Sequence, residues 1–142
     1  MSPKKHIYKM LILESHLDTF GHVNNASYLQ ILEEARWDLV TQQGYGLNRI
    51  LESGQGPVIL EAQLRFRKEL RLRQQITIMT EFSSFEKRLA KIHQEILNEE
   101  NFLCCTAEFK FGLFDTKTRK LIAPTPEWLK AIGADLNEPQ GI

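Results

Sequence analysis

The sequence predicts an α+β fold in which an antiparallel five-stranded sheet wraps around one long central helix. Three observations predict this architecture. A single apolar segment near the N-terminus is followed by one long amphipathic segment. Four segments with strand patterns then follow one another at hairpin spacing, which favours an antiparallel sheet over βαβ units. Their apolar sides need a partner, and the amphipathic segment is the only element large enough to provide it.

The N-terminal third supplies the first strand and the long helix. A strand is expected at residues 6–13, where the chain is apolar and β-prone on both sides. The helix is expected from about residue 25 to residue 42, ending at the glycine of "QQGYG". A loop then leads to Pro57, with a short helical turn at residues 47–52. The apolar positions of the long helix recur at helical spacing: Tyr28, Leu29, Ile31, Leu32, Ala35, Leu39 and Val40.

The rest of the chain alternates with a period of two, which predicts strands. In "PVILEAQLRF" one predicted face carries apolar residues from Val58 to Phe66, and the other is polar except for Ile59. Further strands are expected at residues 75–85, 89–97 and 102–114, and "DTKTRK" predicts a turn. "TPEWLKAIG" predicts a short C-terminal helix, with an N-cap threonine, a proline at the first position and a glycine beyond its end. Residues 1–142 are therefore expected to form a single domain.

Composition narrows the function classes. Lys+Arg and Asp+Glu both number 18, so no global field attracts nucleic acid or an anionic membrane. No apolar run approaches the about 18 residues of a spanning helix, so no membrane insertion is expected. The two cysteines, Cys104 and Cys105, are adjacent and suit neither a mutual disulfide nor a shared metal. A cytoplasmic protein with reduced thiols is the simplest interpretation. The four histidines lack metal-ligand spacing, so no metal is expected.

A dense polar stretch, Asp18 to Tyr28, lies just before the long helix. One interpretation is a turn followed by a well-capped helix, since Gly and Asn favour turns and Asn favours N-caps. The other is an active site. A helix that begins at Asn24 or Asn25 offers unpaired N–H groups and a positive dipole end, which suit a developing oxyanion. A carboxylate such as that of Asp18, facing this donor, is what hydrolysis of an activated acyl group needs.

The run "RFRKELRLR", residues 65–73, also has two interpretations. A solvated turn at a strand end explains its charges. Nucleic-acid binding is not favoured, because no RNA-binding motif is near and the overall charge is neutral. A binding site for a small phosphate-bearing ligand is the sharper alternative.

The pattern D-x-x-G-H-V-N-N-x-x-Y, Asp18 to Tyr28, resembles the signature of hotdog-fold acyl-CoA thioesterases of the 4-hydroxybenzoyl-CoA thioesterase type. The segment "YLQILEEARW" is similar to the bacterial long-chain acyl-CoA thioesterase branch. The resemblance implies a hotdog fold and an enzyme without a cofactor. It implies hydrolysis of acyl-CoA, with medium- to long-chain fatty acyl groups, to free acid and coenzyme A.

The resemblance also implies roles for individual residues. Asp18 matches the catalytic carboxylate, which acts as general base or as nucleophile. Asn25 matches the position whose backbone N–H polarises the thioester carbonyl. Gly21 matches a glycine where the backbone passes close to the ligand, and His22 matches a histidine with a supporting role. Tyr28 either lines the pocket or is a core aromatic residue.

The chain departs from its relatives at two places. Phe20 stands where the similar plant acyl-carrier-protein thioesterases have a catalytic Asn, which argues against their mechanism. "KELRLRQQ" replaces the usual Pro and Gly-Asp pair, so ligand contacts cannot be carried over from that turn. The phosphates of coenzyme A need cations at the pocket mouth. The candidates are Arg65, Arg67, Lys87 and Arg88.

Other functions stay open at this point. One is an acyl-carrier-protein thioesterase, and another is a hotdog dehydratase that pairs His22 with Glu33 or Glu34, although its F-P-G motif is missing. The third is a non-catalytic acyl-binding module. Leu29 and its helical neighbours could line an acyl tunnel or belong to the core. The resemblance implies a homo-oligomer, at least a dimer and preferably a tetramer, with active sites at the subunit interface, since hotdog relatives pair their sheets edge to edge. Such pairing also removes an exposed strand edge.

Overall fold

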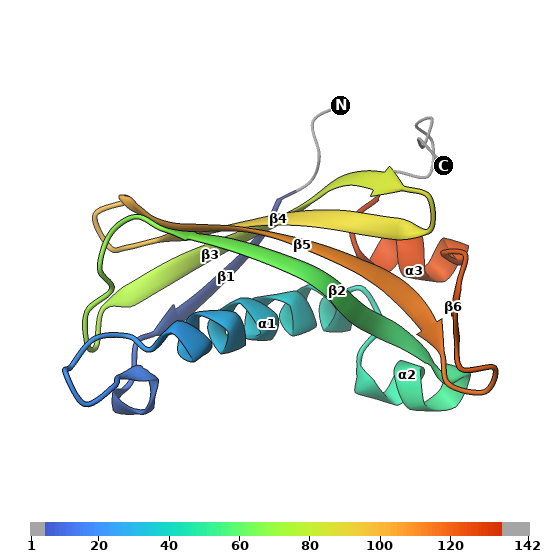
Figure 1. Cartoon of the computed structure of the whole chain (residues 1–142), viewed down its shortest axis with the longest axis horizontal. Coiled ribbons are helices and arrows are strands. Elements are labelled where there is room, and N and C mark those ends of the chain that lie inside the picture. The colour runs from blue at the N-terminus through green and yellow to red at the C-terminus, as the bar shows by residue number, and fades with distance from the viewer. Residues whose placement is uncertain (1–4, 135–142) are drawn as a thin grey trace.

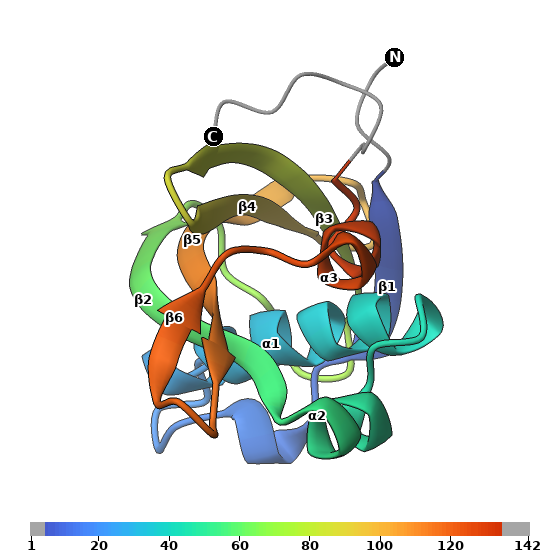
Figure 2. The same ribbon diagram turned by 90° about the vertical axis from the view of Figure 1, so that its right-hand side faces the viewer.

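A curved antiparallel sheet covers one long helix in the computed structural model, which describes residues 5–134 (Figure 1). The sheet has six strands in the order β1-β3-β4-β5-β2, and β6 also pairs with β5. The strands are β1 (His6–Leu11), β2 (Gln55–Phe66), β3 (Gln75–Glu86), β4 (Leu89–Leu97), β5 (Leu103–Asp115) and β6 (Lys120–Ile122). The helices are α1 (Asn25–Gln42), α2 (Leu47–Ser53) and α3 (Pro126–Ala131). Figure 2 shows the sheet curving over α1, as the sequence predicted.

Two short elements were not predicted. β6 has three residues and pairs with the end of β5, beyond the turn "DTKTRK". Three residues are too few to show a periodic pattern, so five strands were predicted where six are present. The first strand ends at Leu11, and a 3-10 turn (Glu14–His16) follows it. The short C-terminal helix begins as predicted, with the Oγ1 of Thr125 accepting a hydrogen bond from Trp128 N at 3.2 Å.

The core lies between α1 and the concave face of the sheet. Leu32 and Ala35 have no exposed surface, so both belong to the core and do not line a tunnel. Leu29 is 44% exposed, because it lies on the side of α1 that the sheet does not cover. The residues of α1 that are buried are Ser27, Tyr28, Ile31, Leu32, Ala35, Leu39 and Val40.

A β-bulge interrupts β2, the strand at one edge of the sheet. Its register against β5 shifts between Ile59 and Glu61, so Leu60 is an extra residue. Ile59 lines a cavity beside α1, and Leu64 packs against the core. Five positions separate these two residues, and a regular strand would place them on opposite faces. The predicted single apolar face from Val58 to Phe66 is therefore wrong for the first half of the strand.

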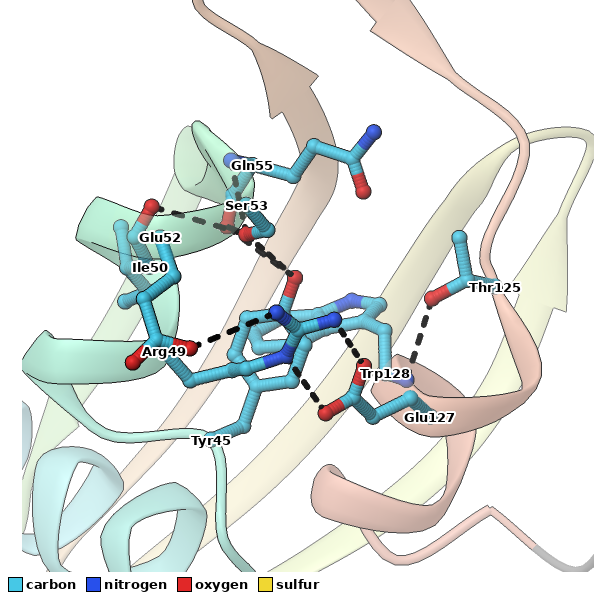
Figure 3. A network of polar contacts seen from close by, with 9 residues as sticks. All are labelled: Tyr45, Arg49, Ile50, Glu52, Ser53, Gln55, Thr125, Glu127 and Trp128. Atoms are coloured by element: carbon cyan, nitrogen blue, oxygen red, sulfur yellow. Dashed lines mark hydrogen bonds and ion pairs between the residues drawn. The ribbon is translucent and has the colours of Figure 1, made fainter.

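Helices α2 and α3 lie at the C-terminal end of α1 and are tied together by polar contacts (Figure 3). Arg49 donates from Nε and Nη2 to the two carboxylate oxygens of Glu127, at 2.7 and 2.8 Å. The hydroxyl of Tyr45 donates to the carbonyl of Gln55 at 3.1 Å, and its ring meets Trp128 edge-on with centroids 5.0 Å apart. These contacts hold Trp128 against the core at this end of the molecule. Within residues 5–134, no helix is long and apolar enough to span a membrane.

Candidate active site

The predicted motif forms a tight loop that leads directly into α1. The N–H of Asp18 donates to the carbonyl of His22 at 2.8 Å, and the N–H of Gly21 donates to the carbonyl of Asp18 at 3.1 Å. Gly21 has φ +80°, a left-handed conformation in which residues with a side chain are strained. A Cβ at this position would meet no atom within 4 Å, so the backbone conformation, and not space, requires the glycine.

The carboxylate of Asp18 is half-buried and uses one of its oxygens to hold this loop. Its Oδ1 accepts hydrogen bonds from the N–H of Phe20 at 2.9 Å and of His22 at 3.1 Å. No donor among the described residues reaches Oδ2. The turn interpretation is therefore correct for one oxygen, and the second oxygen is available for chemistry.

The first turn of α1 has one backbone donor without a partner in the described part of the chain. Asn24 is the N-cap, and its side chain accepts from Ala26 N at 2.7 Å. Its carbonyl accepts from the N–H groups of Ser27 and Tyr28, at 2.9 and 3.3 Å. The N–H of Asn25 makes no hydrogen bond within residues 5–134. This unpaired donor at the positive end of a helix is where the motif predicted an oxyanion donor.

An open cavity of about 310 Å³ lies beside this helix end. It brings together four of the predicted site residues, His22, Asn25, Tyr28 and Arg67. Asp18 and Gly21 are not among the lining residues, but the carboxylate of Asp18 accepts a hydrogen bond from the N–H of His22, which does line the cavity. The complete lining is His22, Val23, Asn25, Tyr28, Phe66, Arg67, Lys68 and Glu69.

His22 and Tyr28 differ in how they meet solvent. The His22 side chain is 67% exposed, and its Nε2 lies 3.7 Å from a carboxylate oxygen of Glu69. Tyr28 is buried in the core, and its ring meets Phe66 edge-on with centroids 4.8 Å apart. Burial raises the pKa of Tyr28 to about 12. Its hydroxyl therefore stays protonated at neutral pH, which suits support of the cavity wall and not the role of a base.

The structure brings one of the four predicted cations into the cavity. Arg67 lines it, whereas Arg65 follows the core-facing Leu64 and so lies on the opposite face of the sheet. Lys87 and Arg88 form the β3–β4 turn, at the other end of the sheet from the Asp18 loop (Figure 1). There the Nη1 of Arg88 donates to the carbonyl of Leu121 at 3.1 Å.

Lys68 and Glu69 line the cavity and were not singled out from the sequence. The Nζ of Lys68 lies 3.8 Å from the ring centroid of Phe102. Both residues belong to the basic run that suggested a phosphate-bearing ligand, and they follow Arg67, the first residue after the strand that ends at Phe66. Because Phe66 packs against Tyr28, the residues that follow Phe66 lie near the start of α1. Phe66 and Tyr28 are far apart in the sequence, so no local sequence pattern predicts this contact.

The residues that a dehydratase would pair are separated within one chain. Glu33 accepts from Trp37 Nε1 at 3.0 Å, and Glu34 accepts from the hydroxyl of Tyr8. At 1.5 Å per residue, Glu33 lies about 12 Å along α1 from Asn25. His22 instead lies near Glu69. Both cysteines are free and buried, and no group of three potential metal ligands is found within residues 5–134.

Residues 13–133 match the thioesterase-like superfamily. The chain belongs to this superfamily. Over 109 residues it is 30% identical to the long-chain acyl-CoA thioesterase FadM of Escherichia coli, a match that covers 76% of this chain and 82% of FadM. The crystal structure of the probable thioesterase YbaW from Escherichia coli aligns with a TM-score of 0.79 and 26% identity, covering 90% of this chain and 98% of YbaW.

A further match is a Staphylococcus aureus protein whose structure was solved in complex with CoA. It aligns with a TM-score of 0.84 at 15% identity and covers 99% of this chain and 92% of that protein, a likeness that shows the fold. The predictions of a hotdog fold and of a thioesterase are therefore confirmed.

Proposed function

We propose that this member of the superfamily hydrolyses acyl-CoA to free acid and coenzyme A, with Asp18 and the backbone N–H of Asn25 as its catalytic groups. The observation that carries the proposal is the pair of unused groups at one helix end. Asp18 keeps one carboxylate oxygen without a donor in the described chain, and the N–H of Asn25 has no acceptor there. The motif that contains both residues is the one that resembles the thioesterase signature.

In this proposal the two groups act on opposite sides of the thioester carbonyl. The Oδ2 of Asp18 takes a proton from water, which attacks the carbonyl carbon, or it attacks that carbon itself. The N–H of Asn25 donates to the oxygen as it becomes negative. The C–S bond then breaks, and coenzyme A leaves as the thiol with the proton that Asp18 took from water. If Asp18 attacks the carbonyl carbon itself, coenzyme A leaves as the thiolate and water then hydrolyses the acyl–aspartate anhydride. That water supplies the oxygen of the free acid and the proton that converts the thiolate to the thiol. Hydrogen bonds from Phe20 and His22 to Oδ1 fix the carboxylate during these steps.

The cavity supports coenzyme A as the carrier. Arg67 and Lys68 supply positive charge at its wall for the phosphates of the nucleotide. The relative FadM is named as a long-chain acyl-CoA thioesterase, and the Staphylococcus aureus protein was solved with CoA. We extend both properties to this chain, with medium- to long-chain fatty acyl groups as substrates and the cytoplasm as the location.

A homo-oligomer completes the proposal, with the site at the boundary between subunits. β2 is an edge strand whose Leu60 and Phe66 are 47% and 53% exposed. Beside it, Leu29 and Trp37 on α1 are 44% and 36% exposed. Pairing of two β2 strands would cover this apolar surface and remove the open edge. The same strand ends at Phe66 in the wall of the cavity, which places the site next to the proposed contact.

The test is hydrolysis of palmitoyl-CoA by the purified chain, with a thiol reagent that reports released coenzyme A. We expect turnover that is faster for medium- and long-chain substrates than for acetyl-CoA, because burial contributes about 0.8 kcal/mol per methylene. Palmitoyl attached to acyl-carrier protein is the comparison for the alternative carrier. Absence of coenzyme A release from every acyl-CoA would reject the proposal, and a profile that peaks at acetyl-CoA would reject its chain-length part.

A further inference from the structure

A second cavity, of about 190 Å³, lies beside the C-terminal half of α1. Its wall is mostly apolar, with contributions from Val40 on α1, Ile59 on β2, Phe111 on β5 and Trp128 on α3. The pair of Arg49 and Glu127 holds α3, and with it Trp128, in place (Figure 3). The cavity is remote from the start of α1, since Arg36 on its wall follows Asn25 by eleven residues, about 17 Å at 1.5 Å per residue.

Arg36 is the cation on this apolar wall. Its guanidinium carbon lies 4.1 Å from the ring centroid of Phe109, and its Nη1 donates to the Oε1 of Gln94 at 2.9 Å. No carboxylate among residues 5–134 lies within ion-pair distance of it. Burial lowers the pKa of Arg36 to about 10, so the group is still charged at neutral pH. The fold thus keeps a partly desolvated positive charge that makes no ion pair within 4 Å among residues 5–134, although the nearby carboxylate of Glu33 acts on it through space.

The partner that Arg36 does have is fixed in orientation. Gln94 is fully buried, and its Nε2 donates to the carbonyl of Leu32 at 3.1 Å and to the Oγ1 of Thr80 at 2.9 Å. Both amide protons are used, so Oε1 has to face Arg36. A guanidinium carries five N–H donors, and this contact uses one. Every fully buried polar side-chain atom in residues 5–134 has a partner, so the other guanidinium nitrogens are not sealed in the core. They keep some accessible surface, and Arg36 is one of the residues that line the cavity.

We infer that this cavity binds the distal part of an acyl chain that carries a neutral oxygen, a hydroxyl or an oxo group, and that Arg36 donates to that oxygen. The inference rests on the proposed thioesterase function and names its substrate class. An unsubstituted chain would cover the guanidinium and leave its donors unpaired, which is costly in apolar surroundings.

A carboxylate at the same position is disfavoured by Glu33, which also lines the cavity. The carboxylate of Glu33 accepts from Trp37 Nε1 at 3.0 Å, so its negative charge is held at this rim. A second anion that entered the cavity would be repelled by it, whereas a hydroxyl or a ketone would not.

The kinetic test compares three substrates of equal length: a plain acyl-CoA, its ω-hydroxy form and its ω-carboxy form, at 12, 14 and 16 carbons. We expect kcat/KM for the ω-hydroxy form to exceed that for the plain form by about tenfold at one length or more, since a charged hydrogen bond contributes on this scale. The ω-carboxy form should show no such gain. In Arg36→Met the ratio of hydroxy to plain should fall to about one.

The matched control is Arg119→Met, which removes an arginine that is also placed over a phenylalanine, 5.3 Å from the ring centroid of Phe114. This variant should keep the wild-type ratio. A ratio near one at every length in the wild type, or a ratio that Arg36→Met leaves unchanged, would overturn the inference. A preference for the ω-carboxy form would overturn it as well.

A binding test does not depend on hydrolysis. Trp37 and Trp128 both line the cavity, and the sequence contains two tryptophans, so intrinsic fluorescence reports on this site. Titration with octan-1-ol or 2-octanone should give a saturable change, about tenfold weaker in Arg36→Met, and octanoate should bind more weakly than octan-1-ol. Equal affinities in both proteins, or tighter octanoate binding, would contradict the inference. Binding of the alcohol by a protein that cleaves no acyl-CoA would reject the proposed function and leave the cavity's preference intact.

Discussion

Glu127 on α3 accepts two hydrogen bonds from Arg49 on α2, at 2.7 and 2.8 Å (Figure 3). The two side chains are 78 residues apart in sequence, and both are partly exposed, at 38% for Arg49 and 47% for Glu127. This two-pronged contact fixes the helix that carries Trp128 into the wall of the second cavity.

The Arg49–Glu127 pair predicts a pH-dependent contribution to stability. The hydrogen bonds from Arg49 lower the pKa of Glu127, so the contact stabilises the fold above the ordinary carboxyl pKa and is lost as pH falls through the lowered pKa. Glu127→Gln should therefore have a slightly lower Tm than the wild type at pH 7, and the difference should vanish in acid. Glu52→Gln is the control. Glu52 also lies near Arg49, but at 3.7 Å the contact is longer than the hydrogen bonds to Glu127, so this substitution should change the Tm less. Thermal melts from pH 7 to pH 3 that show a constant difference would contradict this account.

Substitution of Gln94 should affect stability more than substitution of Glu127, because Gln94 is fully buried and makes three hydrogen bonds. Gln94→Leu should lower the free energy of unfolding by about 1–3 kcal/mol, the usual cost of leaving buried polar partners unsatisfied. Gln30→Leu, at an exposed position of α1, should change it by less than about 0.5 kcal/mol. Urea unfolding of both variants provides the measurement. Equal effects would show that the Gln94 network does not contribute.

Local signals predicted much of this fold. The N-cap and proline of α3 act within one helical turn, so residues 125–126 were enough to place its start. The start of α1 was placed within one residue for the same reason, and the structure assigns the cap to Asn24 and the first helical position to Asn25. The loop between Asp18 and Gly21 was also predictable, since its hydrogen bonds span few residues.

Features set by distant pairing were not predictable in this way. The bulge at Leu60 follows from the register of β2 against β5, and the sequence of β2 departs from alternation only at Ile59, which does not by itself locate a bulge. The charges of Lys87 and Arg88 suggested phosphate binding, but charge alone does not say at which end of the sheet a turn lies. Lys68 lines the cavity because β2, which ends two residues before it, ends beside α1.

The exposed edge of β2 is the proposed contact between subunits, so a change on this edge should alter the oligomeric state. Leu60→Lys places a charge on the apolar edge and should convert the proposed oligomer to monomers, with a loss of acyl-CoA turnover if the site lies at the subunit boundary. Leu51→Lys is the matched control, because Leu51 is even more exposed, at 71%, and belongs to α2 and not to the edge strand. Size-exclusion chromatography with light scattering decides the matter. A monomeric wild type, or a Leu60→Lys variant with unchanged mass, would contradict the proposal.

Lys68 is expected to contribute to substrate binding through the phosphates of coenzyme A. Lys68→Ala should raise KM for palmitoyl-CoA about three- to tenfold with little change in kcat, because the contact is made equally in ground and transition states. The effect should disappear with a palmitoyl thioester of N-acetylcysteamine, which has no phosphate. Lys117→Ala, in the β5–β6 turn, is the control. A Lys68→Ala variant with unchanged KM for palmitoyl-CoA would remove this residue from the proposed phosphate site.

Asp18 is proposed to be catalytic and not only to hold its loop. Asp18→Asn keeps an oxygen that can accept from the N–H groups of Phe20 and His22, so the loop should stay folded. Its amide can neither take a proton nor attack a carbonyl. Asn25→Ala is the contrast, since it keeps the backbone N–H and removes a side chain that does not cap α1. The cap belongs to Asn24, so Asn25→Ala should cost well under the about 1 kcal/mol of a lost N-cap.

Steady-state hydrolysis of palmitoyl-CoA by Asp18→Asn, with folding checked by thermal melts, tests this claim most directly. We predict that kcat falls by about 10²–10⁴-fold, the usual contribution of a positioned acid–base group, while KM changes little and Asn25→Ala stays close to the wild type. A folded Asp18→Asn enzyme with near-normal kcat would contradict the catalytic role and leave Asp18 as a residue that only closes a turn.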